Sequence, residues 1–312
     1  MNFCVPPIDK EIDMNKYWFT AAVAVLAAGS AMAQANDTLA KIKNSGAITL
    51  GVRESSGLSY TLGNGKYVGF HTEMAERIIS DIQKQLGLSK IDIKYQPITS
   101  QNRVPLVTNG TVDFECGSTT NNRARAKDVA FAVTTYVEEV RIATKTNSGI
   151  NGIKDLNGKT VATTTGTTSV QTLRKNERAT GIDFKNVLGK DHADSFLLLE
   201  TGRADAFVMD GSILAANISK AKSPADFHIV GEVLSVEPIA CMMPKDDPAF
   251  KKAVDDSIKR QIADGSLAKL YDRWFMQPIP PANVKVGLPL SAATKQAWAN
   301  PNDKPAEDYE IK

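Results

Sequence analysis

A cluster of polar residues between positions 113 and 125 has the composition of a binding turn. A predicted strand, residues 112–116, leads into Gly117, which is followed by three hydroxyl residues, two asparagines and a basic run that includes Arg125. Gly117 lets the backbone approach a bound group, and the hydroxyls can donate or accept hydrogen bonds. We expect Arg125 one turn into a helix, where its guanidinium could bind a carboxylate through two N–H groups. By itself, the stretch is equally consistent with an ordinary capped helix.

A second hydroxyl-rich turn, residues 164–169, follows a predicted strand and opens a predicted helix that runs through Leu173. The free N–H groups and the positive dipole end at a helix start favour an anion there. The turn lacks the Gly-Lys-Ser/Thr ending of a nucleotide-binding loop, so no phosphate-binding lysine is expected. Simple helix capping remains an equally good interpretation of this turn alone.

Two single charged residues follow predicted strands. Arg53 comes directly after the strand at 47–52, and Asp210 lies at the end of the strand that begins at Ala204. In open α/β sheets, ligands bind outside the carboxyl ends of the strands. Arg53 is therefore placed to bind an anion and Asp210 an ammonium group, although a solvated loop is the commoner place for a single arginine.

The composition is that of a globular protein of one or two domains. The chain has 312 residues, 42% of them hydrophobic, and a net charge of +2, which is too small to indicate nucleic-acid binding. Residues 1–33 are predicted to be a secretory signal peptide, because the apolar stretch 17–33 is short for a membrane span and ends in Ala-Met-Ala. Acidic residues precede Met14, which suggests Met14 as the true start and Gln34 as the first mature residue. The alternative is an uncleaved membrane anchor.

Export of the chain determines how the cysteines are interpreted. After removal of the signal peptide, only Cys116 and Cys241 remain. In an oxidising compartment two cysteines favour a disulfide over metal ligands or nucleophiles. The three histidines are far apart in sequence and lack the spacing of metal ligands, so we expect no metal site and no cofactor.

The alternation of predicted strands and helices indicates parallel α/β sheets. Two consecutive α/β units, each with a polar turn, predict two lobes with a cleft between them. The predicted helices are residues 38–45, 72–86, 103–109, 196–201, 250–264 and 266–276, and the main predicted strands are residues 47–52, 91–98, 112–116, 140–145, 160–163, 184–188, 204–208, 228–230 and 239–243, with a hairpin near 63–66. Weak periodicity and several prolines predict a loosely packed tail from residue 278 onward.

The order of several short motifs resembles that of the bacterial extracellular solute-binding proteins, family 3, which bind polar amino acids. The motifs are Ile48–Val52, Tyr67–Phe70, Asn109–Phe114, Asp155–Lys159, Thr164–Ser169, Gly202–Ala206 and Lys269–Phe275. Within this order, the segments that resemble the glutamate/aspartate-binding subgroup are Arg53–Ser56, Ser100–Arg103, Phe114–Asn122, Lys190–His192 and Pro278–Pro281. His71 departs from the wider family, in which many members have Asp after the Gly-Phe pair. The resemblance spans nearly the whole mature chain.

The resemblance implies an α/β fold of the type II periplasmic binding proteins, in which two crossover hinge strands, here near 135–139 and 235–239, join two lobes. The implied division is residues 34–137 and 237–290 for lobe 1, residues 138–236 for lobe 2 and residues 291–312 for a C-terminal tail. In such a fold Cys241 lies next to Cys116, which supports their disulfide.

The resemblance also implies a site for an acidic amino acid, L-glutamate or L-aspartate. The implied ligand-binding residues are Arg53, Ser100, Arg103, Ser118, Thr120, Arg125, Thr165, Thr168, His192 and Asp210. Arg125 and Thr168 would hold the α-carboxylate, Asp210 the ammonium group, and Arg53 and Arg103 the side-chain carboxylate. An amide ligand would leave an arginine unpaired, at a cost of about 3 kcal/mol or about a hundredfold in affinity, so the site predicts an acid.

The implied function is the solute-binding component of an ABC transporter, which closes its two lobes over the ligand and delivers it to permease subunits in the inner membrane. The ATPase would be a separate chain, because this one has no Walker motif. We expect a monomer without enzymatic activity. Two alternatives remain: an enzyme that resembles cyclohexadienyl or prephenate dehydratases, with Glu115 as a further candidate acid, and a sensor input module.

Overall fold

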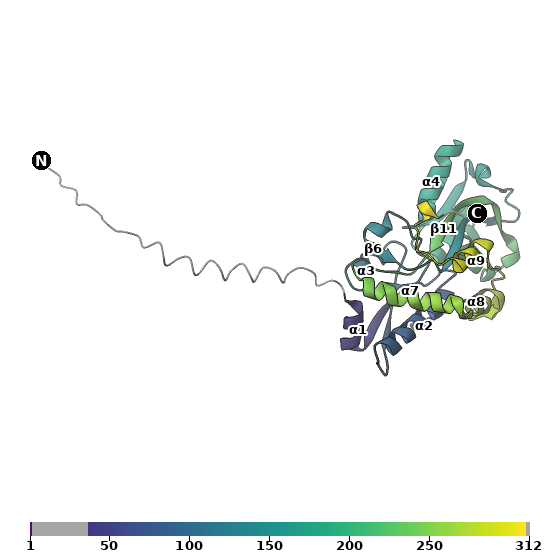
Figure 1. The fold of residues 1–312 in the computed structure, drawn as a ribbon. Helices are drawn as coiled ribbons and strands as arrows, with labels where there is room; N and C mark the ends of the chain where they lie inside the picture. Colours follow the sequence, from purple (N-terminus) through teal and green to yellow (C-terminus); the bar gives the residue numbers. More distant parts are fainter. Residues whose placement is uncertain (2–36, 310–312) are drawn as a thin grey trace. The chain divides into compact units, whose positions relative to one another are not determined.

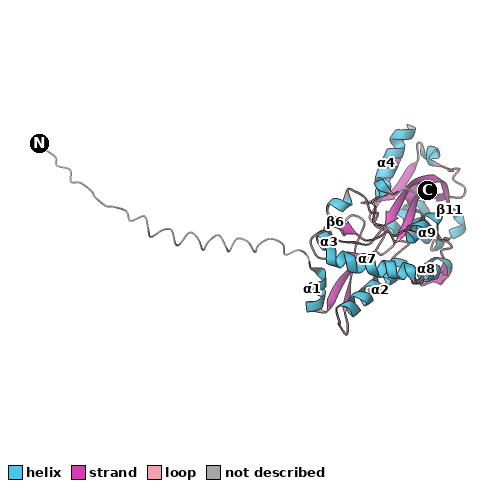
Figure 2. Cartoon of the chain, viewed as in Figure 1, coloured by secondary structure: helices cyan, strands magenta, loops and turns pink. Residues whose placement is uncertain are grey.

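The computed structural model describes Met1 and residues 37–309, and the account below concerns residues 37–309 (Figure 1, Figure 2). The predicted signal peptide, apart from Met1, lies outside the described residues. Within residues 37–309, none of the helices combines the length and the apolar character that a membrane crossing needs.

The first five-stranded sheet carries the first polar turn. Its strands are β1 (Ala47–Val52), β4 (Asp92–Pro97), β5 (Phe114–Glu115), β6 (Val129–Phe131) and β12 (Met242–Pro244). They lie in the order β4-β1-β5-β12-β6, with β1 parallel to β4 and β5, and with β12 antiparallel to β5 and β6. We call the part of the protein built on this sheet lobe 1.

The second five-stranded sheet carries the second polar turn, and we call the part built on it lobe 2. Its strands are β7 (Tyr136–Lys145), β8 (Thr160–Thr164), β9 (Lys185–Gly189), β10 (Ala206–Asp210) and β11 (Phe227–Ile239). They lie in the order β11-β7-β10-β8-β9. Strand β8 is parallel to β9 and β10, whereas β7 is antiparallel to β10 and β11. The prediction of parallel sheets is therefore correct for β1, β4 and β5 in lobe 1 and for β8, β9 and β10 in lobe 2. It is wrong for the other strands of the two sheets, β6, β12, β7 and β11, whose pairings are antiparallel.

Strands β7 and β11 connect the two lobes at the segments predicted as crossovers. Tyr136 pairs with Ile239 and Val140 with Ser235, so the two strands lie side by side and run in opposite directions. On the lobe 1 side, the N–H of Thr135 donates to the carbonyl of Ile239 at 2.9 Å.

Two short hairpins complete the strands. They are β2 (Tyr60–Gly63) with β3 (Lys66–Val68), and β13 (Pro278–Ile279) with β14 (Val284–Lys285). The first confirms the hairpin predicted from its Asn-Gly pair, since Asn64 and Gly65 both have positive φ.

The helices cover the faces of both sheets. They are α1 (Thr38–Ser45), α2 (Phe70–Gln85), α3 (Arg103–Thr108), α4 (Thr168–Thr180), α5 (His192–Glu200), α6 (Gly211–Ser219), α7 (Pro248–Ala263), α8 (Ser266–Tyr271) and α9 (Ala292–Ala299), with 3₁₀ turns η1 (Arg125–Lys127), η2 (Ile153–Leu156), η3 (Pro224–Asp226) and η5 (Ala306–Asp308) and a π-helical turn η4 (Asp272–Met276). Helix α2 buries Met74, Ile78 and Ile82 in the core of lobe 1 and lies beside α7 (Figure 1). In lobe 2, α4, α5 and α6 pack on the sheet.

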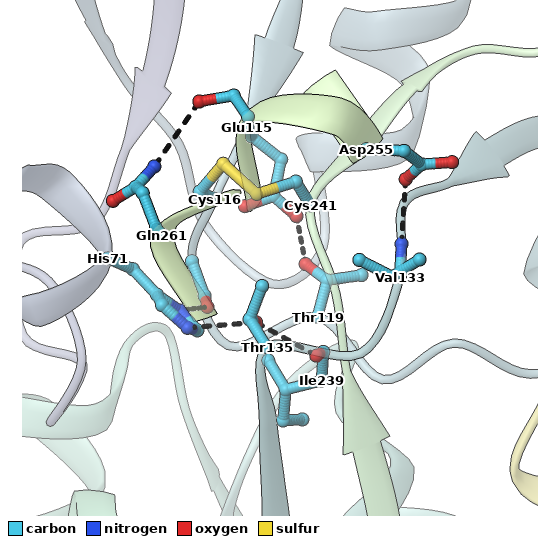
Figure 3. Close-up of a disulfide and its surroundings, with 12 residues drawn as sticks. His71, Glu115, Cys116, Thr119, Val133, Thr135, Ile239, Cys241, Asp255 and Gln261 are labelled. Atoms are coloured by element: carbon cyan, nitrogen blue, oxygen red, sulfur yellow. Dashed lines mark hydrogen bonds between the residues drawn. A yellow bond between two sulfur atoms is a disulfide. The ribbon is translucent and has the colours of Figure 1, made fainter. Parts of the chain in front are cut away.

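The predicted disulfide is confirmed. Cys116 directly follows β5, and Cys241 directly precedes β12, whose Met242 pairs with Glu115. The two Cα atoms lie 4.3 Å apart and the sulfurs are bonded (Figure 3). The bridge therefore links the two segments of lobe 1 that are separated by the whole of lobe 2.

Two predicted elements are wrong. The basic run around Arg125 forms only a single 3₁₀ turn, because strand β6 begins at Val129 and leaves no room for a longer helix. The tail after residue 278 is not loosely packed: α9 forms there, and its Trp298 donates from Nε1 to the carbonyl of Thr135 at 2.8 Å. The tail thus contacts the start of the first crossover strand.

Candidate functional site

The predicted ligand-binding residues come from strand ends and helix starts of both lobes, and nearly all of them converge. Lobe 1 contributes the segment after β1, the start of α3 and the hydroxyl turn after β5, while lobe 2 contributes the starts of α4 and α5 and the end of β10. The interlobe site, as we define it, consists of Arg53, Ser100, Arg103, Ser118, Thr119, Thr120, Arg125, Thr168, Asp191, His192, Asp210 and Glu237. All are buried except Arg125, Thr168 and Asp191, which are partly exposed.

Arg53 crosses from lobe 1 to a charged pair in lobe 2. Its Nη2 donates to Asp191 Oδ1 at 2.7 Å and lies 3.0 Å from His192 Nε2. Asp191 also accepts from Ser55 Oγ at 2.6 Å, so one carboxylate binds two groups of lobe 1. Burial alone would raise the pKa of Asp191, but the charge of Arg53 and the hydrogen bonds from Ser55 and Arg53 outweigh burial and hold that pKa below its usual value. Asp191 is thus a member of the site that was not predicted.

His192 is occupied on both ring nitrogens. A guanidinium can only donate, so Nε2 accepts from Arg53, and the proton is on Nδ1, which lies 3.0 Å from the hydroxyl of Thr164. Burial, together with the charge of Arg53, lowers the pKa of His192 to about 3. In this geometry His192 is a neutral side chain that orients Arg53.

Arg103 is a buried cation without a carboxylate partner within 4 Å among the described residues, and 2% of it is exposed. Its Nη1 donates to the carbonyl of Ser118 at 3.0 Å and to the hydroxyl of Thr119 at 2.7 Å. Thr119 in turn donates to Glu115, which is fully buried (Figure 3). Burial and the neighbouring charge of Arg125 lower the pKa of Arg103. The site therefore holds a positive charge that is only indirectly compensated.

Arg125 spans the two polar turns. Its Nη1 donates to the carbonyl of Thr120 at 2.9 Å in lobe 1, and its Nη2 donates to the carbonyl of Gly166 at 3.3 Å in lobe 2. The Oγ1 atoms of Thr120 and Thr168 lie 3.4 Å apart. The two hydroxyl-rich turns that the sequence singled out thus face each other.

Glu237 on the second crossover strand is a further residue of the site that sequence reasoning missed. Its Oε2 accepts from Thr120 at 2.5 Å and from Thr168 at 2.7 Å, and the residue is 3% exposed. Because each hydroxyl donates its hydrogen bond to Glu237, both threonine oxygens can only accept a hydrogen bond from a third group. The available signal was an acid within a predicted hinge strand, which is uncommon in a buried segment.

Asp210 is a buried carboxylate with no hydrogen-bond partner for Oδ1 within the described part of the chain, and it is 2% exposed. Burial raises its pKa well above the usual value, and the acids Glu138 and Glu237 add to this effect, while Arg103 and Arg125 oppose it. An ammonium group placed beside Asp210 would offset the cost of burying this acid.

Polar atoms without partners are concentrated in the interlobe site. Among residues 37–309, buried polar atoms without a hydrogen-bond partner include Arg53 Nε, Ser100 Oγ, Arg103 Nε and Asp210 Oδ1. Buried polar groups are normally satisfied, so several such atoms at one place indicate that a polar ligand belongs there. Thr165 differs from this pattern, since its hydroxyl donates to the carbonyl of Gly189 at 3.0 Å within lobe 2.

The two lobes approach each other closely at two glycines. A Cβ on Gly57 of lobe 1 would lie 2.4 Å from the carbonyl oxygen of Ser212 in lobe 2. A Cβ on Gly166 of lobe 2 would lie 2.7 Å from Cα of Gln101 in lobe 1. Together with the Arg53–Asp191 ion pair, these contacts show that the structure has the lobes closed on each other.

Comparison with known sequences gives a match over most of the chain. The sequence pattern of the bacterial extracellular solute-binding proteins, family 3, matches residues 48–277. The chain is 42% identical over 291 residues to the L-glutamate/L-aspartate-binding protein of Pseudomonas aeruginosa, which covers 92% of this chain and 96% of that protein. It is 43% identical over 291 residues to the glutamate/aspartate import solute-binding protein of Escherichia coli K12, and this alignment covers 91% of this chain and 96% of that protein.

Comparison with solved structures gives the same fold. A mutant of ArgBP from T. maritima aligns with a TM-score of 0.68 at 26% identity, over 77% of this chain and 99% of that one. The cysteine-binding protein from Campylobacter jejuni also aligns with a TM-score of 0.68, at 24% identity, over 76% of this chain and 92% of that one. The predicted fold, a two-lobe α/β protein of the type II periplasmic binding class, is confirmed.

Proposed function

Because this chain belongs to family 3 of the bacterial extracellular solute-binding proteins, we propose that it binds L-glutamate or L-aspartate as the solute-binding component of an ABC importer. The relatives of 42% and 43% identity, which are named for glutamate and aspartate, support this class of ligand. The loaded protein would deliver its ligand to permease subunits of the inner membrane, with transport driven by an ATPase on a separate chain.

The observation that carries the proposal is a buried arginine and a buried aspartate that both lack a direct charge partner among the described residues. Arg103 has no carboxylate within 4 Å, and Asp210 makes no side-chain hydrogen bond, within residues 37–309. A buried unpaired charge costs several kcal/mol, and a ligand that brings both a carboxylate and an ammonium group would relieve both costs at once. An amino acid has this combination of groups.

The second carboxylate of an acidic amino acid has a place beside the other arginines. We assign the side-chain carboxylate to Arg103 and to the free Nε of Arg53, with Ser100 as a further donor. The α-carboxylate is assigned to Arg125 and to the first N–H groups of α4, which have no partners inside the helix. Asp210 would bind the ammonium group.

The hydroxyls of Thr120 and Thr168 refine this assignment. Both donate to Glu237, so their oxygens suit the ammonium group, and we assign Thr168 to the α-carboxylate only through its backbone N–H. Ser118 lies 3.4 Å from Arg53 Nη1 and belongs to the same side as the side-chain carboxylate. Thr165 and His192 already make hydrogen bonds within the protein, so we assign them an indirect role. Thr165 would hold its turn against Gly189, and His192 would orient Arg53.

The test is calorimetric titration of Arg103→Met with glutamate, aspartate and glutamine, after removal of carried-over ligand. We expect loss of glutamate affinity by about a hundredfold or more, because a buried carboxylate would lose its charge partner at a cost of about 3 kcal/mol. Met keeps much of the volume, and urea unfolding checks the fold. Arg123→Ala, at an exposed position of the same turn, is the matched control. Unchanged glutamate affinity in Arg103→Met, or tight binding of glutamine by the natural protein, would contradict the proposal.

We further propose that the protein binds its ligand without converting it. The enzyme alternative is tested by adding prephenate to the natural protein, since turnover would give heat that continues after saturation and a new product, and either would favour a dehydratase. Export to the periplasm, with cleavage near Ala33, and lobes divided as residues 34–137, 138–236 and 237–290 complete the proposal. Recovery of a periplasmic chain that begins at Gln34 would support export.

A further inference from the structure

Asp210 directly precedes helix α6, but its side chain does not cap the helix. Asp210 occupies the N-cap position, where a carboxylate usually accepts from the backbone N–H two or three residues further along, here Ser212 or Ile213. Its side chain makes no such hydrogen bond, and its Oδ1 has no partner in the described part of the chain. The usual helix-capping role of this aspartate is therefore taken by another group.

That group is Glu138, on the first crossover strand. Glu138 Oε2 accepts from the backbone N–H of Ser212 at 3.3 Å, and Oε1 accepts from the Ser212 hydroxyl. Ser212 is the second residue of α6, and both Ser212 and Glu138 are buried. A carboxylate at a helix start is favoured by the free N–H groups and the helix dipole. Glu138 thus supplies, from a different strand, the cap that Asp210 could supply locally.

This arrangement has an electrostatic cost. Glu138 lies directly opposite Glu237 in the strand pairing, and both acids act on Asp210. Burial raises the pKa of Glu138 to about 8, and the charges of Glu237 and Glu139 contribute in the same direction. A cap from Asp210 itself would avoid one buried acid. The extra carboxylate therefore indicates that a benefit to function offsets this cost, and that the benefit comes from keeping the Asp210 carboxylate free of the N–H groups of α6.

We propose that Glu138 is a positioning residue for ligand binding: by capping α6 in place of Asp210, it leaves the Asp210 carboxylate free to bind the ligand's ammonium group. The inference rests on the proposed function, because it takes Asp210 as the ammonium-binding acid. Without an acceptor at position 138, Asp210 turns toward the N–H of Ser212, and binding an ammonium group then requires breaking this local cap.

The test compares two ligands that differ only in the ammonium group, glutamate and glutarate, by calorimetric titration of three variants. In Glu138→Leu, which keeps volume but has no acceptor, glutamate affinity falls roughly tenfold, the worth of a helix cap, whereas glutarate affinity changes less than twofold. In Glu138→Gln, whose amide oxygen still accepts from Ser212, glutamate affinity stays within about threefold of the natural protein. Glu139→Leu, at the neighbouring, partly exposed position of β7, leaves both affinities unchanged.

Three results would overturn the inference. Unchanged glutamate affinity in Glu138→Leu would show that the cap is not needed. An equal loss for glutarate would indicate a general structural role, and an equal loss in Glu138→Gln would show that the charge and not the hydrogen bond matters. Urea unfolding checks each fold, and Glu138→Met replaces the leucine variant if that one does not fold. If the natural protein itself fails to bind glutamate, the proposed function fails and not the role of Glu138 alone.

Discussion

Replacing Gly57 by alanine should prevent the lobes from closing fully. The Cβ would lie 2.4 Å from the carbonyl oxygen and 2.6 Å from the carbonyl carbon of Ser212, which are backbone atoms that no side-chain rotation can move. Ordinary contacts need about 1 Å more, since optimal carbon separations begin near 3.5 Å. The φ of Gly57 lies outside the left-handed region, so alanine adds no backbone strain in an open form.

The magnitude follows from the contacts that cross between the lobes nearby. An opening of about 1 Å stretches the 2.7 Å bond between Arg53 and Asp191 beyond hydrogen-bonding distance, together with contacts that a ligand makes to both lobes. Charge-assisted hydrogen bonds contribute about 1.5–3 kcal/mol each, so a loss of about 3 kcal/mol, or about a hundredfold in glutamate affinity, is expected.

The assay is calorimetric titration with glutamate, together with urea unfolding of the ligand-free protein. Gly152→Ala is the matched control, because a Cβ at that position meets only the mobile end of the Glu232 side chain, within lobe 2. We expect Gly57→Ala to unfold at the same urea concentration as the natural protein but to bind glutamate weakly. Natural affinity in Gly57→Ala would refute the reasoning, since the ligand would then be bound without the lobe approach seen here.

Two further predictions concern stability. Removing the disulfide with Cys116→Ala and Cys241→Ala together should lower the free energy of unfolding by about 5 kcal/mol, because the bridge closes a loop of 125 residues in the unfolded chain; a loss below about 1 kcal/mol in urea unfolding would contradict this. His71 is buried, and burial lowers its pKa to about 4, so the unfolded chain takes up a proton that the folded chain excludes as the pH falls from 6.5 toward 4. Between pH 7.5 and pH 5 the natural protein should therefore lose about 2 kcal/mol more stability than His71→Gln, and equal pH dependence of the two would refute the assignment.

The elements with strong local signals were predicted well. The first helix, the first strand and the Asn-Gly hairpin are found at the predicted positions, because caps, periodicity and turn residues act over a few neighbouring positions. The helix at Arg125 was wrong because a following strand limits the segment to one turn. Helix α9 was missed because proline-rich residues before it hide its pattern, and because Trp298 is held by a backbone carbonyl in the crossover region.

The candidate site was likewise predicted in part from the sequence. Its convergence was predicted from charged and hydroxyl residues at strand ends, and most of those residues come together. Asp191 and Glu237 were missed: Asp191 lies in the segment Lys190–His192, but only His192 was chosen from it, and Glu237 lies in no motif. Their roles arise from partners more than 100 residues away, Arg53 for Asp191 and Thr120 for Glu237.

The sequence by itself determined the family, the two polar turns and the cysteine pair, and the resemblance to the family predicted an acidic ligand. These depend on residue types and local spacing. Only the tertiary structure decided which side chains are paired: Arg53 is bound to Asp191, Arg103 has no carboxylate within 4 Å among residues 37–309, and Glu138 in place of Asp210 accepts from the start of α6. Charge pairing depends on ångström distances between distant segments and on the exclusion of water, and neither quantity is present in the order of residues.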